Sequence, residues 1–320
     1  MSSIPRVSVL MPVRNGLPFL KEAVDSILDQ SIKDVELVVV DDGSEDGSTS
    51  YLMARSLEDA RVVLLRNAKS YGISAALNLG AEYCRAPWIA RMDCDDRALP
   101  QRLERQLAFL DVNPDVQALG SLAYLINSQG HRIGLAPHDM TTRNAYKKYM
   151  ESNRTIGLVH PSVIIRRVSL REVGGYRSDF EPAEDIDLWN RLSEQGPVLV
   201  LPEFLLEYRV HPTSVVSTRL ELALLKEEWV EACMLARRNG SPEPIWGEFR
   251  NRCENASLQQ RLNRQRRILA ERLLSLARRD LAAGARSQGR AKQVVAAALR
   301  PIDAAPKILR QMRLALRQES

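Results

Sequence analysis

The sequence predicts an α/β protein with a Rossmann-like, mixed but mainly parallel sheet that is flanked by helices and followed by a C-terminal α-helical extension. Three observations lead to this prediction. Strand-like apolar runs alternate with segments of helical spacing up to about residue 92. Polar clusters come directly after the apolar runs, and strand signals end at about residue 218.

The first elements follow a regular alternation. Runs that are apolar throughout predict strands covered on both faces, as in parallel sheets. The segments between them repeat their apolar residues at helical spacing, which predicts crossover helices. The expected strands are residues 7–11, 35–40, 61–65 and 88–92, and the expected helices are residues 17–30, 48–56 and 74–84.

The later elements are less regular, and residues 138–156 carry no clear pattern. From about residue 218 the chain shows only the pattern of long helices. We therefore expect two parts, residues 1–216 and a helical extension over residues 217–320. The first part should also contain helices over residues 100–109 and 184–195, strands over 116–126 and 159–166, and one or two short strands over 198–210.

The extension is basic. From Arg219 to the end the chain has 21 lysines and arginines against 11 acidic residues, whereas the remainder has 24 against 29. Basic amphipathic helices can lie on an anionic membrane surface, and they can equally pack on their own domain or self-associate. No motif supports nucleic acid as a partner. The apolar stripe is Leu262, Leu269, Leu273 and Leu276, flanked by Arg264, Arg267, Arg278 and Arg279, and residues 307–317 repeat the pattern.

Two further features bear on the compartment. The four cysteines have no metal-binding or redox spacing, which is typical of free thiols in a reducing compartment. The first residues do not have the pattern of a signal peptide, and no run approaches the roughly 18 apolar residues of a spanning helix. We expect a cytoplasmic protein, with a possible peripheral position on the inner face of the membrane.

An Asp-x-Asp ends the fourth expected strand. In an extended backbone the side chains of Asp93 and Asp95 point the same way, so two carboxylates can face one spot. Hard cations such as Mg²⁺ are held in this manner, together with substrate phosphate oxygens. Ligands of parallel α/β sheets bind at the carboxyl ends of the strands. The polar clusters at those ends are residues 12–16, 41–48, 67–72 and 93–97.

Several phosphate-binding classes are disfavoured by missing motifs. The turn after the first strand has no G-x-G-x-x-G, which a nicotinamide enzyme of this architecture needs. The chain has no G-x-x-x-x-G-K-[ST], which disfavours a P-loop phosphotransferase. It also lacks the G-x-G-x-R-L stretch of sugar nucleotidyltransferases.

A set of motifs in matching order resembles family 2 glycosyltransferases, which have the GT-A fold. The resemblance covers about residues 5–216. It implies a nucleotide-binding half over about residues 1–97 and an acceptor-side half over residues 98–216. The motifs are VSVLMPVRNG, VVVDDGSEDGS, N-x(4)-G-I-S-A-A-L-N-x-G, ARMDCDD, HPSVIIRR, GGYR and EPAEDIDLWNRL.

The resemblance implies catalytic roles that agree with the chemistry of the residues. Asp95, with Asp93, would bind Mn²⁺ or Mg²⁺ at the donor diphosphate. Asp185, next to Glu184, would act as the general base for the acceptor hydroxyl. The sequence offers no second carboxylate as a nucleophile, so inversion by single displacement is expected. Each of these acids could instead serve only a turn or the first turn of a helix.

Contacts to the two substrates are also implied. Asp42 would accept a hydrogen bond from the base of the nucleotide. The expected nucleotide-sugar contacts are Pro12, Val13, Arg14, Asp42, Asn67, Gly72, Asn78, Asp93 and Cys94. His211 is a weaker metal or phosphate candidate. The acceptor-side candidates are His160, Tyr176 and Trp189. The rings of Tyr176 and Trp189 could stack on a sugar, and Trp189 could equally be a core residue.

The expected function is non-processive transfer by a hexosyl- or N-acetylhexosaminyltransferase, because the chain lacks the spanning helices and the Q-x-x-R-W motif of processive synthases. UDP is the expected donor carrier, with GDP and dTDP open. The acceptor is a lipid-linked oligosaccharide, a surface glycan precursor or a protein. The alternatives are a polyprenyl-phosphate sugar transferase and a catalytically silent nucleotide-sugar-binding scaffold.

Overall fold

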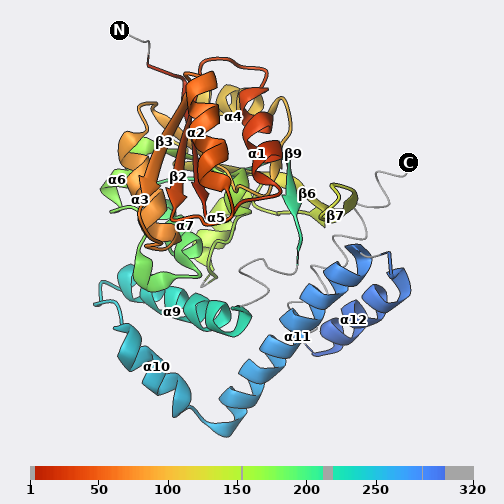
Figure 1. Ribbon diagram of the computed structural model, residues 1–320. Coiled ribbons are helices and arrows are strands. Elements are labelled where there is room, and N and C mark those ends of the chain that lie inside the picture. The colour runs from red at the N-terminus through yellow and green to blue at the C-terminus, as the bar shows by residue number, and fades with distance from the viewer. Residues whose placement is uncertain (1–3, 153, 212–218, 283, 300–320) are drawn as a thin grey trace. The chain divides into compact units, whose positions relative to one another are not determined.

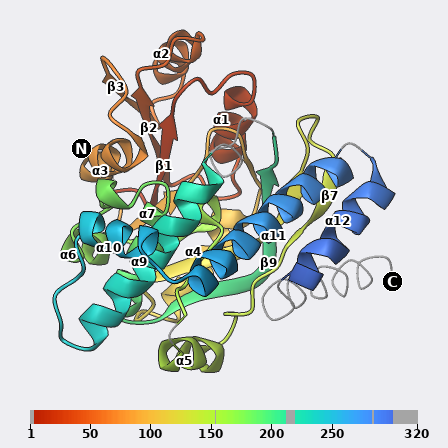
Figure 2. The ribbon, with the colours of Figure 1, turned by 90° about the horizontal axis from the view of Figure 1, so that it is seen from below.

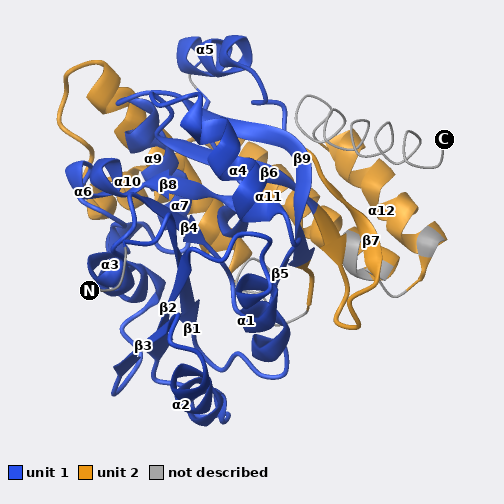
Figure 3. Cartoon of the chain, turned by 90° about the horizontal axis from the view of Figure 1, so that it is seen from above, with its two compact units in different colours: residues 1–123, 138–208 blue, residues 124–137, 209–320 orange. Residues whose placement is uncertain are grey.

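The computed structural model describes residues 4–152, 154–211, 219–282 and 284–299 (Figure 1). The chain forms two compact units. The first comprises residues 1–123 and 138–208, and the second comprises residues 124–137 and 209–320 (Figure 3). Most of the sheet belongs to the first unit. The C-terminal helices belong to the second, together with a short hairpin segment that the sequence pattern assigned to the first part.

The nucleotide-binding half contains the parallel strands that the sequence predicts. Each strand is a β-branched, apolar run, and all four pair in parallel in the order β3-β2-β1-β4. In the register Val13 lies opposite Asp41, and Asp42 lies opposite Asn67. The polar ends of the strands therefore lie at one edge of the sheet. The strands are β1 (Val7–Val13), β2 (Val35–Asp42), β3 (Val62–Asn67) and β4 (Trp88–Arg91).

Crossover helices cover both faces of these strands. Helices α1 and α3 lie on opposite faces, as the reversal of strand order between β3 and β4 requires (Figure 3). Gly80 lets α3 approach the sheet closely, because a Cβ there would lie 2.2 Å from Leu10 Cδ1. The helices are α1 (Leu20–Leu28), α2 (Ser48–Glu58) and α3 (Ile73–Tyr83).

The sheet continues past β4 with antiparallel strands, which makes it mixed. Where one or two short strands are expected over residues 198–210, the structure has a single strand of 12 residues. Residues 159–166 begin as a 3₁₀ turn, η1 (His160–Ser162), before the strand starts. The strands are β5 (Arg97–Ala98), β6 (Ala118–Ile126), β7 (Arg132–Ala136), β8 (Ile164–Arg166) and β9 (Val198–Arg209).

The remaining elements of the first unit are the helices of the acceptor-side half. Helix α5 lies in residues 138–156, where the sequence shows no clear pattern. None of its residues is fully buried, although Tyr146, Tyr149 and Met150 pack against the hydrophobic core from one face. Thr142 caps the helix by accepting from the Ala145 N–H. The elements are α4 (Arg102–Asp111), α5 (Arg143–Glu151), α6 (Arg167–Glu172), η2 (Ser178–Phe180) and α7 (Glu184–Ser193).

The second unit consists of helices and of the hairpin segment around β7. Helix α11 packs along α12 and also contacts β7, which groups residues 124–137 with the C-terminal helices. None of the described helices is long and apolar enough to cross a membrane. The predicted repeat over residues 307–317 lies outside the described residues. The helices are α9 (Leu220–Arg238), α10 (Trp246–Glu254), α11 (Leu258–Ala282) and α12 (Arg286–Leu299).

Candidate active site

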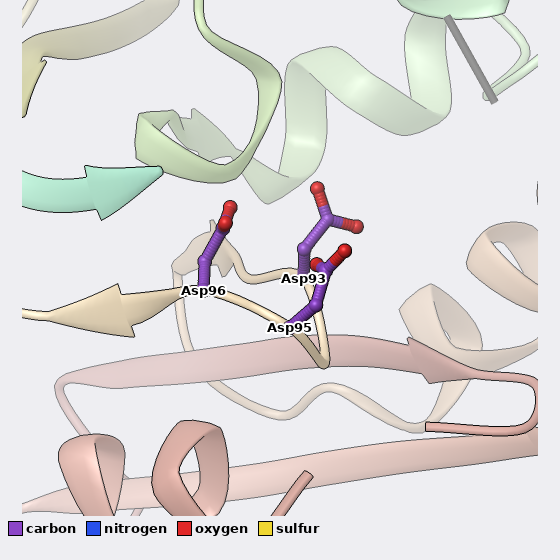
Figure 4. Close-up of side chains that lie close together, drawn as sticks. All are labelled: Asp93, Asp95 and Asp96. Atoms are coloured by element: carbon purple, nitrogen blue, oxygen red, sulfur yellow. The ribbon is translucent and has the colours of Figure 1, made fainter. Parts of the chain in front are cut away.

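Three carboxylates gather in the loop between β4 and β5. Asp93, Asp95 and Asp96 each offer an oxygen, and these oxygens lie within 4.8 Å of one another. Their side chains project from the same side of the loop (Figure 4). The sequence predicts that Asp93 and Asp95 face one spot, and the structure adds Asp96. A set of carboxylate oxygens in this spacing suits Mg²⁺ or Mn²⁺.

Two buried arginines lie behind the acidic cluster. Arg91, the last residue of β4, forms an ion pair with Asp93. Burial opposes its charge, but Asp93 and Asp96 hold the pKa of Arg91 above its ordinary value. Arg102 donates to the Arg91 carbonyl at 2.8 Å, and burial lowers its pKa to about 9. Sequence reasoning missed both residues, although an arginine inside an apolar strand run was a signal for Arg91.

A second pair of carboxyl groups begins helix α7. Burial raises the pKa of Glu184 to about 8, and the neighbouring charge of Asp185 adds to the shift. Burial also raises the pKa of Asp185 to about 6, although its oxygen accepts from the Ile186 N–H at 2.8 Å. Because the two groups titrate together, the proton that is held near neutral pH belongs to the pair, and Asp185 is the more easily ionised of the two. When ionised, Asp185 can accept a proton.

The aromatic candidates lie inside the protein. Trp189 has no exposed surface and belongs to the hydrophobic core, which is the alternative that the sequence left open. Tyr176 is 3% exposed, and its hydroxyl lies 3.0 Å from His160 Nε2. Stacking on an acceptor sugar needs an exposed ring face, so the predicted stacking by these two rings is not supported. His160 is half-buried, and burial with nearby Arg91 lowers its pKa.

The segment that carries Tyr176 is fixed from two directions. The Asn78 side chain of α3 donates to the Tyr176 carbonyl and accepts from its N–H, both at 2.8 Å. The predicted place of Asn78 at the border of the nucleotide stays a prediction. From α7, Asp187 binds both Arg177 and Arg191, and Arg191 donates to the Gly175 carbonyl at 2.7 Å. The motifs GGYR and EDIDLWNRL thus hold each other together.

Asp42 organises the loop that follows β3. One carboxylate oxygen accepts from Asn67 Nδ2 at 2.7 Å, and the other accepts from the Ser70 hydroxyl at 2.7 Å. The Tyr71 and Gly72 N–H groups also donate to it. Burial opposes the charge, but these donors lower the pKa of Asp42. Asp42, Asn67 and Gly72 are thereby brought together as predicted, while the contact from Asp42 to the base stays a prediction.

Glu181 connects the two halves of the first unit. Its carboxylate accepts from the Ser74 N–H at 2.8 Å, in the first turn of α3. A Cβ at Gly72 would lie 3.1 Å from the same carboxylate, so glycine makes room for it. Glu181 stands only three residues before Glu184 in the chain. Glu181 is the first residue of the motif EPAEDIDLWNRL, and the sequence alone indicates no role for it.

The turn after β1 is the predicted base and ribose contact. Its backbone is held by two serines: Ser44, in the loop before α2, accepts from the Asn15 N–H, and Ser48, the first residue of α2, accepts from the Gly16 N–H, both at 2.9 Å. Cys94 Sγ packs against Gly16, and burial raises the pKa of its thiol. Pro12, Val13, Arg14 and Cys94 thus lie close to one another, and their contacts to a nucleotide stay predictions. His211 belongs to the second unit, so its role also stays a prediction.

Comparison with known proteins agrees with this geometry. The family model for glycosyl transferase family 2 matches residues 8–174. The O-antigen biosynthesis glycosyltransferase WbnJ of Escherichia coli is 30% identical over 217 residues, which cover 67% of this chain and 83% of the relative. The chain belongs to glycosyl transferase family 2, and it is a glycosyltransferase.

Solved structures share its fold at low identity. Staphylococcus aureus TarS 1–349 in complex with UDP-GlcNAc has a TM-score of 0.55 at 16% identity, covering 91% of this chain and 89% of that chain. The mannosyltransferase PcManGT of Pyrobaculum calidifontis, in complex with GDP-Man and Mn²⁺, has a TM-score of 0.54 at 19% identity, covering 98% of this chain and 81% of that chain. The fold is GT-A, as the sequence predicts.

Proposed function

We propose that the protein is an inverting, metal-dependent and non-processive glycosyltransferase that moves a sugar from a nucleoside-diphosphate sugar to an acceptor hydroxyl. The observation that carries the proposal is Asp185. Burial raises its pKa to about 6, and a general base works best when its pKa lies near the working pH. The acidic cluster of Asp93, Asp95 and Asp96 supplies the second requirement, a site for a divalent cation.

Each group of residues has a defined task in this reaction. Asp93, Asp95 and Asp96 would hold Mn²⁺ or Mg²⁺, which when bound neutralises charge on the departing diphosphate. Asp185 accepts the proton of the acceptor hydroxyl as that oxygen attacks the anomeric carbon. Burial raises the pKa of Glu184 to about 8, which opposes its ionisation at neutral pH. A protonated carboxyl group is a poor nucleophile, which supports single displacement with inversion.

The proposed donor and biosynthetic role are supported by the similar proteins. TarS is solved with UDP-GlcNAc and PcManGT with GDP-Man and Mn²⁺, which supports a nucleoside-diphosphate sugar as donor and UDP or GDP as its carrier. WbnJ supports a role in O-antigen or other polysaccharide synthesis. The proposed acceptor is a surface glycan precursor, lipid-linked or free. The proposed location is the cytoplasm at the inner face of the membrane, supported by the basic C-terminal helices and the free cysteines.

A thermal-shift panel tests the donor and metal parts directly. The full chain is melted with UDP, GDP, dTDP or CDP, each in the presence of Mn²⁺, Mg²⁺ or EDTA. A ligand that binds only the folded state raises the melting temperature by mass action. We expect one nucleotide, UDP first, to raise it with a metal ion and to lose the effect with EDTA. The absence of a shift for every nucleotide would contradict the proposed donor site.

A pair of variants makes this panel specific for the acidic cluster. Asp95→Ala should remove the metal-dependent shift, because it deletes one of the three carboxylates. Asp34→Ala is the matched control, since Asp34 is an exposed acid outside the cluster. Equal shifts in the two variants would remove the metal site from the proposal. The polyprenyl-phosphate alternative is recognised separately, because an ionised phosphate acceptor needs no general base and transfer would survive Asp185→Asn.

A further inference from the structure

Helix α11 presents two different apolar faces. One face packs on α12, where Ala270 and Leu274 contact Ala296, with Leu273 at its margin. Figure 2 shows α11 and α12 side by side. The other face is in contact with water. It consists of four leucines with exposed fractions of 72% at Leu258, 46% at Leu262, 48% at Leu269 and 41% at Leu276.

The exposed leucines form one column along the helix. Their spacings of four, seven and seven residues place them within an arc of roughly 40° at 100° per residue. Between Leu258 and Leu276 the column runs for about 27 Å at 1.5 Å per residue. The exposed Gln265 and Arg272 lie between these leucines, so the column is a row of separate apolar residues. Monomeric proteins expose single apolar residues commonly, whereas four aligned on one face of one helix indicate an interaction surface.

The described charges beside this column are mainly basic. Arg261 and Arg266 are exposed on its two sides, and Arg272 is exposed next to Leu269 and Leu276 while it pairs with Glu221 of α9. The arginines on the far side of α11 serve another purpose. Arg264 and Arg267 bind Glu228 and Glu227 of α9, at 2.9 and 2.5 Å, and so fix α11 to the rest of the unit.

The heptad positions argue against a second copy of α11 as the partner. A coiled-coil seam needs apolar residues at both the a and the d position. If the leucines at 262, 269 and 276 occupy d, the a positions are Gln259, Arg266 and Leu273. If they occupy a, the d positions are Gln265, Arg272 and Arg279. Neither register gives a continuous seam, whereas a flat apolar column with basic flanks suits the boundary between lipid headgroups and acyl chains.

We propose that this leucine column docks the protein on an anionic lipid surface. The leucines enter the headgroup boundary, and the flanking arginines keep their guanidinium groups at the level of the anionic headgroups. Because no sugar transfer is involved, this proposal stands or fails independently of the enzymatic one. The leucine column is Leu258, Leu262, Leu269 and Leu276.

Co-sedimentation with vesicles tests the docking. The probes are vesicles of phosphatidylcholine alone and of phosphatidylcholine mixed with phosphatidylglycerol. The test variant is Leu262→Gln/Leu269→Gln/Leu276→Gln. The matched control is Met53→Gln/Leu57→Gln/Val112→Gln, which changes three exposed apolar residues of the first unit. We expect the full chain to bind the anionic vesicles, the test variant to bind them about tenfold more weakly, and the control to change by less than twofold.

Charge and association complete the test. Arg261→Gln/Arg266→Gln should reduce binding to anionic vesicles and leave the small binding to phosphatidylcholine unchanged. Circular dichroism and the melting temperature confirm that each variant is folded. Undiminished vesicle binding by the leucine variant would overturn the proposal. So would a dimer of the full chain that becomes a monomer in the leucine variant while vesicle binding persists, since the column would then be a contact between copies.

Discussion

Asp42 and Asp185 are both acids of the first unit, yet their surroundings act in opposite directions. Asp42 ends β2 and accepts hydrogen bonds from Asn67, Ser70 and two backbone N–H groups. Its pKa is lowered. Asp185 begins α7 beside Glu184, and burial raises its pKa to about 6. Its carboxylate accepts from the backbone N–H groups of Ile186 and of Asp185 itself.

The difference separates a structural acid from an acid prepared for proton transfer. Several donors fix the charge of a carboxylate, because protonation would sacrifice their hydrogen bonds. Burial with few donors leaves the charge costly and brings the pKa toward the pH of the cell. Asp42 therefore holds a loop in place at any ordinary pH. Asp185 can exchange a proton, which a general base must do.

The largest expected effect is on turnover. Asp185→Asn should lower the rate of nucleoside diphosphate release by about 10³-fold, because general-base catalysis contributes 10²–10⁴-fold. Donor affinity should stay within about twofold, since the acidic cluster is intact. The turnover rate is measured by the release of nucleoside diphosphate, and the donor affinity is measured by nucleotide titration of the same preparation. Near-normal turnover in this variant would remove Asp185 from the role of base.

The pH profile sharpens the same contrast. Asp185 works only when ionised, so the transfer rate should fall about tenfold per pH unit below about 6 and level off above it. Because Asp185 and Glu184 titrate together, the observed midpoint belongs to the pair. The rate of the wild type is followed from pH 5 to 8. A rate that rises as the pH falls would show that the essential group is an acid instead.

The loop beside Asp185 can be loosened while both acids are kept. Gly175 has a φ of 70°, and a Cβ there would lie 2.5 Å from Asn78 Oδ1. Gly175→Ala should therefore lower the free energy of unfolding by about 3 kcal/mol. Gly174→Ala is the control: its φ is 82°, but nothing lies within 4 Å of a Cβ, so about 1 kcal/mol is expected. Equal losses in urea denaturation would show that the contact to Asn78 is unimportant.

The smallest expected effect concerns Glu181. Glu181→Gln keeps an acceptor for the Ser74 N–H but removes the negative charge from the N-terminus of α3. A charge in that place stabilises a helix by about 0.5 kcal/mol, so the variant should lose about that much stability. Urea denaturation at low and at high salt measures it, with a smaller loss at high salt. A loss of several kcal/mol would mean that the glutamine cannot keep the hydrogen bond.

The sequence predicts the parts of the fold that depend on local periodicity. The alternation of apolar runs and helical segments identifies β1 to β4 with their helices, and the motif ARMDCDD identifies the acidic cluster. Helix α5 escapes prediction because its inner face is short and amphipathic: Tyr146, Tyr149 and Met150 are only partly buried and stand among charged residues. The hairpin segment 124–137 groups with the C-terminal helices through contacts of α11, which no local pattern encodes.

Roles that depend on long-range contacts are the ones that sequence reasoning misses. The motif places Asn78 at the nucleotide, but it does not reveal that the amide binds the backbone of Tyr176, which lies 98 residues away. Tyr176 and Trp189 were assigned to the acceptor, and both are buried. Arg91 was overlooked because its ion pair with Asp93 becomes visible only when β4 is placed. Residue type suggests chemistry, whereas burial decides which atoms can perform it.

The measurement that tests the contrast most directly is the free energy of unfolding of Asp42→Asn and Asp185→Asn at pH 5 and pH 8. The raised pKa of Asp185 means that the folded wild type loses stability as the pH rises from about 4 to about 6. The difference in the free energy of unfolding between Asp185→Asn and the wild type should therefore be about 1 kcal/mol more favourable to the variant at pH 8 than at pH 5. Asp42→Asn should lower the free energy of unfolding by about 2 kcal/mol at both pH 5 and pH 8, because the lowered pKa of Asp42 lies below both. A loss of stability in Asp185→Asn that is independent of pH would contradict the account.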